Sequence, residues 1–500
     1  MLKNIQNFVY QRSKQSAVVI TAVFVISFLL RLYGLGAKDF WCDEIFSVRL
    51  SAFPWNNCNA PLYWILLHFW VKIFGISEFS LRFPGMLFSF FTTVIVFLFG
   101  RELFNKKTAS LATLLIGLSA FHLWYAQEAR DYSMVLFFGT LSSHMLLLAI
   151  KKSSFKRWLG FVIVSCVGIY TNYFFIFLIA AQMLYIIFLT KFRVHKAGWA
   201  FLSIAGAFSC YLPGFISKFL FVSGGFWIPK PTWQSLNITL QNFVLGYNGT
   251  VFLYTLASFF TLASFIALCL IACKKRELRQ GIYFCGFLLL IPLGLAFLFS
   301  KLFFSIYLNR GFLLFSPYFY FLISCAVMEL SQGIRIVVVG VLILIFSCGA
   351  YLYFHDYLYS PGEYHLGAYL KKPVRPIANF LDSNVKDGDL VAFTRETEMR
   401  GIGFYSERKL PHYYLFSPQI LNPDWRRPLK GSRYYVPINK IAGLGFKRIW
   451  VISMDWERSG KLDDNSVAVK KWLDINLKLL SSQEFDGVWI YCYGRNNPSN

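Results

Sequence analysis

Long apolar runs recur from about residue 17 to about residue 354, and they constrain the fold of this chain more than any other feature. Hydrophobic residues make up 56% of the sequence and charged residues only 15%, whereas a typical soluble domain carries about 25% charged residues. A run of roughly 20 apolar residues is long enough to cross a bilayer as a helix. The sequence therefore predicts a polytopic α-helical membrane protein with a more polar C-terminal part.

We predict about eleven transmembrane helices within a membrane domain that covers residues 1–354. A long outer loop, residues 35–83, follows the first span, and its apolar, Trp- and Tyr-containing stretch 61–75 is typical of an interfacial helix. Several runs are shorter than the roughly 20 residues of a straight span, so their boundaries are approximate. The predicted spans are 17–34, 84–101, 108–123, 132–150, 158–171, 174–190, 198–215, 251–272, 281–300, 311–329 and 335–354.

Lysine and arginine gather in every second connection between these spans, for example at 151–157 and 274–279. Cytoplasmic loops of membrane proteins are enriched in both residues. We therefore predict a multi-pass protein of the inner (plasma) membrane, with a cytoplasmic N-terminus and an extracytoplasmic C-terminal domain. This topology accounts for the net charge of +24, so no nucleic-acid partner is expected.

Residues 355–500 have a different character, because charge rises and short apolar strands alternate with helical patterns. Such alternation predicts a small α/β domain. The domain contains no GxGxxG or Walker sequence, so nucleotide binding is not predicted. The expected elements are helices at 376–384 and 467–475 and strands at 390–393, 448–452 and 488–491.

Two adjacent acids, Asp43 and Glu44, follow the first predicted span. Acids near lipid are costly and are usually functional, although a solvated pair of loop carboxylates is the alternative. Because adjacent side chains point in different directions, the pair suits two roles, a general base and a residue that organises the site through a cation or metal. Cys42 and Cys58 flank this loop, and they either form a disulfide or stay as two thiols.

Arginines stand at the predicted outer ends of several spans, against the general trend of the positive charges. They are Arg31, Arg82, Arg130 and Arg310, and Glu128 accompanies Arg130 in the same short loop. The alternative for Arg31 is an anchor whose charged end reaches the membrane surface. Guanidinium groups bind phosphate through paired hydrogen bonds, and a phosphate at headgroup depth suggests a lipid phosphate. Acids and arginines on one face therefore favour group transfer from a lipid-phosphate carrier.

The order of these motifs resembles the polytopic glycosyltransferases of the GT-C fold, and more narrowly the bacterial family 39 enzymes. That family is related to the protein O-mannosyltransferases and to the aminoarabinose transferase that modifies lipid A. The resemblance covers most of residues 20–330. The segments that carry it are Arg31–Leu35, Trp41–Glu44, Ala60–Trp64, Leu81–Pro84, Gly100–Phe104, Tyr125–Arg130, Tyr170–Phe174 and Asn309–Arg310.

The resemblance implies distinct roles for the two acids. Asp43 corresponds to the catalytic residue that deprotonates the acceptor, Glu44 to its partner, and Arg31 to the arginine that pairs with this partner. The chain departs from the family at 59–61, which reads Asn-Ala-Pro where His/Asn-Pro-Pro is usual. A precise role for this part of the loop is therefore not assigned.

The resemblance also implies a binding site for the donor. Arg82 corresponds to an arginine that contacts the donor phosphate, Glu128 and Arg130 correspond to a motif that lines the same cavity, and Arg310 would join them. Some relatives hold a divalent metal near the carboxylates. The sequence offers no complete ligand set, so a metal is optional and no cofactor is assigned.

The predicted function is that of an enzyme, a membrane glycosyltransferase. It would move a sugar from a polyprenyl-phosphate donor to an acceptor hydroxyl with inversion, on the extracytoplasmic face. The acceptor would be a lipid, a glycan or a protein, and membrane lipids surround the enzyme. The alternative is a lipid-linked glycan transporter or flippase without transferase activity. That function needs ionisable or broken-helix sites near the bilayer midplane, whereas the acids and arginines here are expected at outer helix ends.

Overall fold

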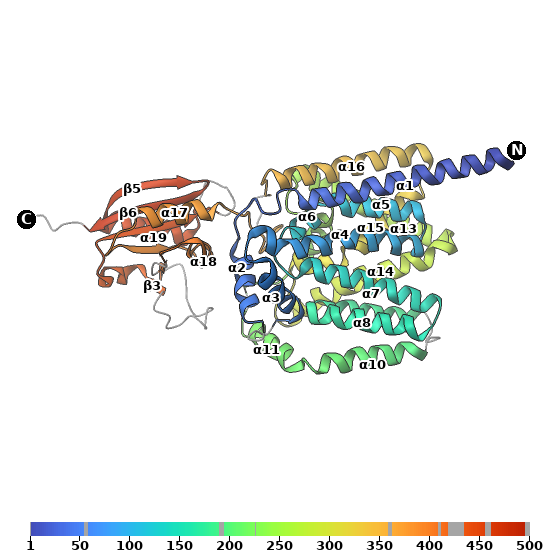
Figure 1. The fold of residues 1–500 in the computed structure, drawn as a ribbon, viewed down its shortest axis with the longest axis horizontal. Coiled ribbons are helices and arrows are strands. Elements are labelled where there is room, and N and C mark those ends of the chain that lie inside the picture. The colour runs from blue at the N-terminus through green and yellow to red at the C-terminus, as the bar shows by residue number, and fades with distance from the viewer. Residues whose placement is uncertain are drawn as a thin grey trace, which may run out of the picture. The chain divides into compact units, whose positions relative to one another are not determined.

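The computed structural model describes residues 2–54, 59–189, 195–225, 227–358, 363–408, 412–418, 435–455 and 462–495. The chain forms two compact units (Figure 1). The helical unit comprises Met1–Leu35 and Leu50–Gly367, and the α/β unit comprises Gly36–Arg49 and Ala368–Asn500. The second boundary lies close to the predicted one, but the α/β unit also takes in the part of the outer loop that carries the two acids.

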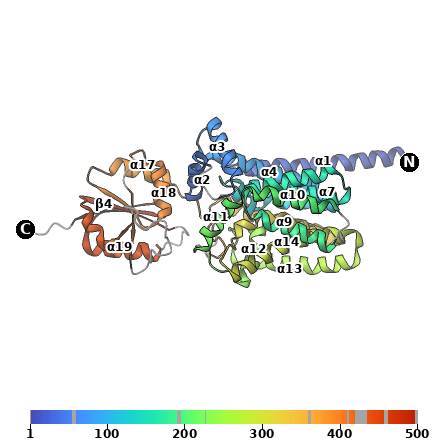
Figure 2. The ribbon, with the colours of Figure 1, turned by 90° about the horizontal axis from the view of Figure 1, so that it is seen from below.

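Helices make up the helical unit, and its long helices lie side by side in both ribbon views (Figures 1 and 2). Helix α2 (Cys42–Ala52) runs across the boundary between the two units. The other helices are α1 (Leu2–Leu32), α3 (Leu62–Phe74), α4 (Glu78–Leu103), α5 (Lys106–Leu118), α6 (Ala120–Ala126), α7 (Tyr132–Lys151), α8 (Phe155–Thr171), α9 (Phe175–Leu189), α10 (His195–Ser209), α11 (Leu212–Ser223), α12 (Trp233–Leu245), α13 (Val251–Lys274), α14 (Arg276–Leu302), η1 (Asn309–Phe315), α15 (Ser316–Met328) and α16 (Gln332–Phe354).

Six helices of the described chain are long and apolar enough to cross a membrane, counting η1 with α15 as one. Two bent pairs raise the number to eight if each pair is one span: α5 with α6, bent by 59°, and α10 with α11, bent by 72°. The other predicted spans correspond to α1 and α9, whose apolar stretches are shorter, and to α8, which has 17 residues. The polytopic helical class is confirmed, and the number eleven stays a prediction, as does the interfacial position of α3.

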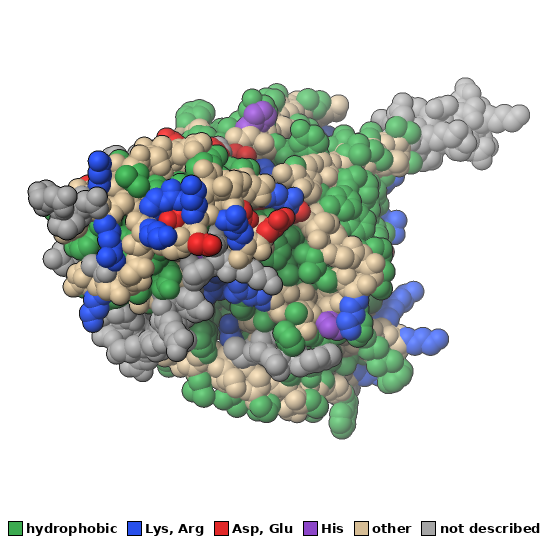
Figure 3. Space-filling model, turned by 60° about the vertical axis from the view of Figure 1, so that its left-hand side comes forward, with side chains coloured by type: hydrophobic (Ala, Val, Ile, Leu, Met, Phe, Trp, Pro, Cys, Tyr) green, Lys and Arg blue, Asp and Glu red, His purple; other side chains and the backbone are tan. Residues whose placement is uncertain are grey.

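The helical unit has apolar side chains outside and polar side chains inside. Hydrophobic side chains cover much of its visible surface (Figure 3). Inside, the amide of Gln182 donates to Ser142 and Ser143, at 3.2 and 2.9 Å, and Ser143 shares a 2.6 Å hydrogen bond with Tyr318. Helices in lipid associate through such buried polar contacts because lipid tails supply little hydrophobic driving force.

A six-stranded sheet forms the centre of the α/β unit in its described part, with the strand order β3-β2-β1-β4-β6-β5. The strands β3, β2, β1 and β4 are parallel, β6 pairs with β4 in the antiparallel direction, and β5 pairs antiparallel with β6. Figure 2 shows α17 and α19 on opposite faces of the sheet. The elements are α17 (Val374–Asn384), β1 (Leu390–Phe393), α18 (Glu396–Tyr405), β2 (His412–Phe416), β3 (Tyr435–Pro437), η4 (Ile438–Leu444), β4 (Arg448–Met454), α19 (Asp464–Asn476), β5 (Leu477–Phe485) and β6 (Val488–Arg495).

Alternation along the strands builds two cores, one on each face of this sheet. Val391 and Phe393 pack with α17 and α18, whereas Leu390 and Ala392 pack with α19. Successive strand residues point to opposite faces, so a strand covered on both sides is apolar throughout. The predicted α/β domain is confirmed, and the three predicted strands correspond to β1, β4 and β6.

Candidate functional site

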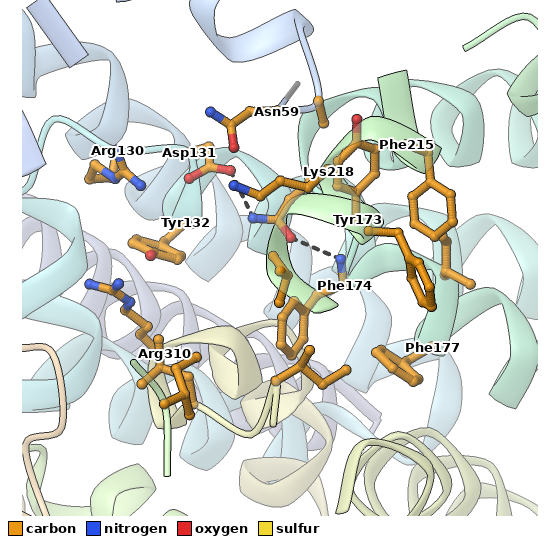
Figure 4. A pocket seen from close by; sticks show the side chains of 18 of the residues that line it. Asn59, Arg130, Asp131, Tyr132, Tyr173, Phe174, Phe177, Phe215, Lys218 and Arg310 are labelled. Atoms are coloured by element: carbon orange, nitrogen blue, oxygen red, sulfur yellow. Dashed lines mark hydrogen bonds between the residues drawn. The ribbon is translucent and has the colours of Figure 1, made fainter. Parts of the chain in front are cut away.

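A cavity of about 330 Å³ opens among helices of the helical unit (Figure 4). Aromatic and aliphatic side chains make up most of its wall. Charged side chains stand among them, drawn from segments far apart in the sequence. The residues that define its chemistry are Asn59, Trp64, Arg130, Asp131, Tyr132, Asn172, Tyr173, Phe174, Phe177, Phe215, Lys218, Phe219, Phe299, Phe304 and Arg310.

Among the described residues, three cations and one carboxylate line this cavity: Arg130, Lys218 and Arg310, with Asp131. In Figure 4 the Lys218 side chain extends toward Asp131. A surplus of positive charge beside aromatic walls attracts an anion strongly, because the low-dielectric wall screens the charges less than water does. The cavity therefore suits a ligand with an anionic group and an apolar body.

Arg130 and Arg310 are brought together around one tyrosine, although 180 residues separate them in the sequence. Their guanidinium carbons lie 5.9 and 5.7 Å from the centre of the Tyr132 ring, and the two groups lie on different sides of it (Figure 4). Arg130 also lies 5.3 Å from the ring centre of Trp64. Contact with aromatic faces orients a guanidinium group.

Asp131 is held in place at the start of helix α7. The side-chain amide of Asn172 donates to the Asp131 carboxylate at 2.7 Å, and the Asn172 carbonyl oxygen accepts from the backbone N–H of Phe174 at 2.9 Å. Asn172 ends helix α8, where its extended backbone breaks the helical run before α9. Asn172, the polar residue between α8 and α9, thus fixes Asp131, the one acid among the described cavity residues.

The short loop that carries Arg130 is anchored by Gln127. The Gln127 amide donates to the carbonyl oxygens of Arg31 and Tyr33, at 3.1 and 2.7 Å, and its carbonyl oxygen accepts from the Tyr353 hydroxyl at 2.8 Å. These bonds tie the loop to the ends of α1 and α16. A buried amide with such partners is costly to displace, so the loop has a fixed place in the helical unit.

Arg310 is positioned by close packing in η1. Its guanidinium donates to the carbonyl oxygen of Gly367 at 2.9 Å. The neighbouring Gly311 has no room for a side chain, because a Cβ there would lie 2.6 Å from the Phe174 ring of the cavity wall. The Asn-Arg-Gly sequence at this point is therefore explained by the approach of η1 to the cavity.

Arg31, Arg82 and Glu128 are buried in the helical unit, outside the described lining of the cavity. Arg31 donates to the backbone carbonyls of 116 and 117 and to the hydroxyls of Ser27 and Ser89. Arg82 donates to the carbonyl oxygen of Leu35 at 3.0 Å. These contacts give Arg31 a structural role in joining α1, α4 and α5. The predicted roles of all three residues toward the donor and Glu44 stay predictions.

Asp43 and Glu44 lie in the first turn of α2, in the α/β unit. Glu44 is fully buried, and its carboxylate lies 3.2 Å from the ammonium group of Lys371. Asp43 is half-buried. The two acids thus have unlike surroundings, and their two predicted roles stay predictions. Arg31 belongs to the other unit, so its pairing with Glu44 is not tested.

Within the described residues, no three His, Cys, Asp or Glu side chains come together as a group that could hold a metal ion. Cys58 lies outside the described residues, so its pairing with Cys42 is not tested.

Sequence reasoning missed Lys218, Asp131 and Asn172. Lys218 had a signal, because it is the one lysine in the apolar run 212–222.

Comparison with solved structures identifies the fold of this chain. The chain superimposes on ArnT from Cupriavidus metallidurans in the apo state with a TM-score of 0.63 and 10% identity, covering 96% of this chain and 98% of ArnT. A form of ArnT bound to undecaprenyl phosphate matches equally well, at 0.63. The archaeal oligosaccharyltransferase AglB from Archaeoglobus fulgidus gives 0.51 at 11% identity, covering 97% of this chain and 75% of AglB. The chain is thus a multi-pass membrane protein with the GT-C fold.

Sequence comparisons match parts of the chain. Residues 59–216 match the dolichyl-phosphate-mannose-protein mannosyltransferase family, so the resemblance to the GT-C glycosyltransferases is confirmed. An undecaprenyl phosphate-alpha-4-amino-4-deoxy-L-arabinose arabinosyl transferase from Wigglesworthia glossinidia brevipalpis is 27% identical over 199 residues. This match spans 35% of the length of that relative and 35% of this chain. An uncharacterised protein of Aquifex aeolicus is 34% identical over 21% of each chain.

Proposed function

We propose that the protein is an integral-membrane glycosyltransferase that moves a sugar from a polyprenyl-phosphate donor to an acceptor hydroxyl. The single observation that carries this proposal is the aromatic cavity lined by Arg130, Lys218 and Arg310, within the GT-C fold. The solved relative that binds undecaprenyl phosphate shares this fold, which supports a lipid-phosphate ligand. The apolar wall of the cavity would hold the first part of the polyprenyl tail.

The charge of the cavity favours the reaction as well as binding. A polyprenyl-phosphate sugar is a phosphodiester with one negative charge, and the polyprenyl phosphate that leaves carries up to two. Three cations against one carboxylate therefore interact more strongly with the leaving group than with the intact donor. Interactions that strengthen as charge develops accelerate the chemical step itself.

Asp43 is the proposed general base. It accepts the proton of the acceptor hydroxyl while the hydroxyl oxygen forms a bond to the anomeric carbon. The bond from that carbon to the phosphate oxygen breaks, and the phosphate leaves with the electron pair. Attack from the opposite face inverts the anomeric centre. Half-burial of Asp43 leaves part of the carboxylate accessible to an acceptor, which suits a base better than the fully buried Glu44.

The proposed enzyme works on the extracytoplasmic face of the inner membrane. The distribution of lysine and arginine supports this orientation, with the N-terminus in the cytoplasm and the C-terminal domain outside. The acceptor is a lipid, a glycan or a protein that presents a hydroxyl group at that face.

Mass spectrometry of envelope lipids, glycans and proteins tests the proposal, using cells without the protein and cells that express the wild type or Asp43→Asn. We expect a sugar to be missing from one acceptor without the protein. The wild type would restore it, and Asp43→Asn would restore less than about a hundredth as much at equal membrane abundance. Full restoration by Asp43→Asn would overturn the assignment of the base. In proteoliposomes, transbilayer movement of the intact lipid-linked sugar without cleavage would instead identify a flippase.

A further inference from the structure

The segment that carries the two acids is built into the α/β unit, although it lies more than 300 residues from that unit's sheet in the sequence. Residues Gly36–Arg49 form one compact unit with Ala368–Asn500. Consecutive residues of the segment reach different parts of the unit. This arrangement raises the question of what the C-terminal domain contributes to the reaction.

Asp39 and Phe40 make the first contacts. The Asp39 carboxylate accepts from the backbone N–H of Arg375, at the start of α17, at 2.7 Å, and it lies 3.6 Å from the guanidinium of the same residue. Helix α17 has no side-chain cap from the residue that precedes it, so Asp39 supplies this cap from a distant part of the chain. The backbone N–H of Phe40 donates to the Tyr405 hydroxyl at 2.8 Å.

Aromatic packing reinforces these polar contacts. The Phe40 ring lies 5.8 Å from that of Phe404 and 6.5 Å from that of Tyr405, and the Trp41 ring lies 6.1 Å from that of Tyr369. Phe40 and Trp41 are both buried. The backbone immediately before the acids is therefore held by hydrogen bonds and by packed rings at the same time.

Glu44 completes the attachment. Its carboxylate is fully buried, and one oxygen lies 3.2 Å from the ammonium of Lys371, whose side chain is 12% exposed. The other oxygen accepts from the backbone N–H of Trp41 at 3.4 Å. A buried carboxylate is stable only with such partners, so the ion pair with Lys371 fixes the position of the Glu44 carboxylate.

We propose that the α/β unit positions the catalytic base, and that Lys371 and Tyr405 are its main positioning residues. Lys371 fixes Glu44, Tyr405 fixes the backbone at Phe40, and both orient the first turn of α2 and thereby Asp43. The inference rests on the proposed function, in which Asp43 is the base. It gives the C-terminal domain a role in setting the geometry of proton transfer.

Steady-state transfer by the full-length protein in proteoliposomes tests this role, with a polyprenyl-phosphate sugar as the donor and the acceptor found by mass spectrometry. Misplacing a catalytic group by about 1 Å costs up to about 100-fold in rate. We expect Lys371→Ala to lower kcat by about 10- to 100-fold with the donor KM unchanged, because the donor cations lie in the helical unit. Lys371→Arg should recover most of the loss. The exposed Lys478 on β5 provides the matched control, Lys478→Ala.

Tyr405→Phe keeps the stacked ring and removes only the hydroxyl. It therefore tests the positioning role even if Lys371→Ala does not fold. We expect a smaller fall in kcat, about two- to tenfold, again without a change in the donor KM. If Lys371→Ala and Tyr405→Phe both keep the wild-type kcat while Asp43→Asn is inactive, the positioning role is wrong and the proposed function stands. If Asp43→Asn is itself fully active, the proposed function fails first. A rise in the donor KM alone would also overturn the positioning role.

Discussion

In the proposed reaction the helical unit supplies cations for the donor phosphate, and the α/β unit supplies the general base. Arg130, Lys218 and Arg310 line the cavity of the helical unit, whereas Asp43 and Glu44 belong to the α/β unit. The helical unit has apolar side chains on its surface, and the α/β unit has an apolar core on each face of its sheet. The two units are thus packed in different ways.

The proposed function predicts that binding of the donor and activation of the acceptor can be perturbed separately. Changes in the helical unit should act on the phosphate, and therefore on both the donor KM and the departure of the leaving group. Changes in the α/β unit should act on proton transfer, and therefore on kcat. A helical-unit variant that changes only proton transfer, or an α/β-unit variant that changes only the donor KM, would contradict this division.

The largest effect in the helical unit is expected from replacing both arginines around Tyr132. The double variant Arg130→Met and Arg310→Met keeps most of the aliphatic volume and removes both guanidinium charges. Because such groups stabilise the leaving phosphate, we expect kcat/KM for the donor to fall by about 100- to 1,000-fold. The measurement is transfer at varied donor concentration in proteoliposomes.

The control for this variant is Arg276→Met, which makes the same chemical change at an exposed arginine in the first turn of α14. It should keep kcat/KM within about twofold of the wild type, as surface substitutions usually do. If the double variant also stays within threefold, the cavity does not hold the donor phosphate, and the comparison between the two units loses its basis.

A smaller effect is expected at Lys218, the cation that sequence reasoning missed. Lys218→Met removes one charged hydrogen-bond donor, so the donor KM should rise by about tenfold. Lys218→Arg keeps the charge and should raise it by less than about threefold. Lys230→Met, at an exposed lysine, is the matched control. An unchanged donor KM in Lys218→Met would remove this residue from the proposed phosphate site.

Much of the fold follows from patterns that the sequence states directly. Apolar runs of helical length predicted the membrane helices, and the apolar stretches at 390–393 and 448–452 predicted the two adjacent central strands β1 and β4. Both patterns can be recognised within a short stretch of sequence, because helices and strands place their side chains at fixed intervals along the chain. The breaks at Ser119 and at 210–211 were not predicted, because each lies inside a run that is apolar throughout.

The candidate site was predicted only in part, because it depends on contacts between distant segments. Arg130 and Arg310 were both singled out, and the structure brings them to one tyrosine. The partnership of Glu44 with Lys371 was not foreseen, since 327 residues separate the two and nothing in either local sequence points to the other. Local sequence patterns show which charged residues lie in apolar surroundings. The residues that pair with them are known only once the chain has folded.

The smallest effect on transfer is expected from a buried ion pair in the sheet of the α/β unit. The Asp389 side chain is only 2% exposed, and it pairs with Arg448 at the start of β4. Burial alone would raise the pKa of the Asp389 carboxyl. Hydrogen bonds from Arg448, from the backbone N–H of Lys386 and from the indole of Trp450 outweigh burial, so this pKa is lowered. The pair therefore stabilises the ionised form in the folded state.

The sign of the pH dependence follows from the lowered pKa. Stability from Asp389 is fully present above its unfolded pKa of about 3.9, and it is lost as the pH falls through the folded value. At neutral pH, Asp389→Asn should lower the free energy of opening of β1 and β4 by about 1–3 kcal/mol, measured by hydrogen exchange in the full-length protein. The difference from the wild type should shrink toward zero as the pH falls below about 3.9. Asp387→Asn, at the exposed acid of the same turn, should change neither the free energy of opening nor its pH dependence. A loss of transfer larger than that of Lys371→Ala would show that the sheet, and not the contacts of Glu44, controls the position of the acids.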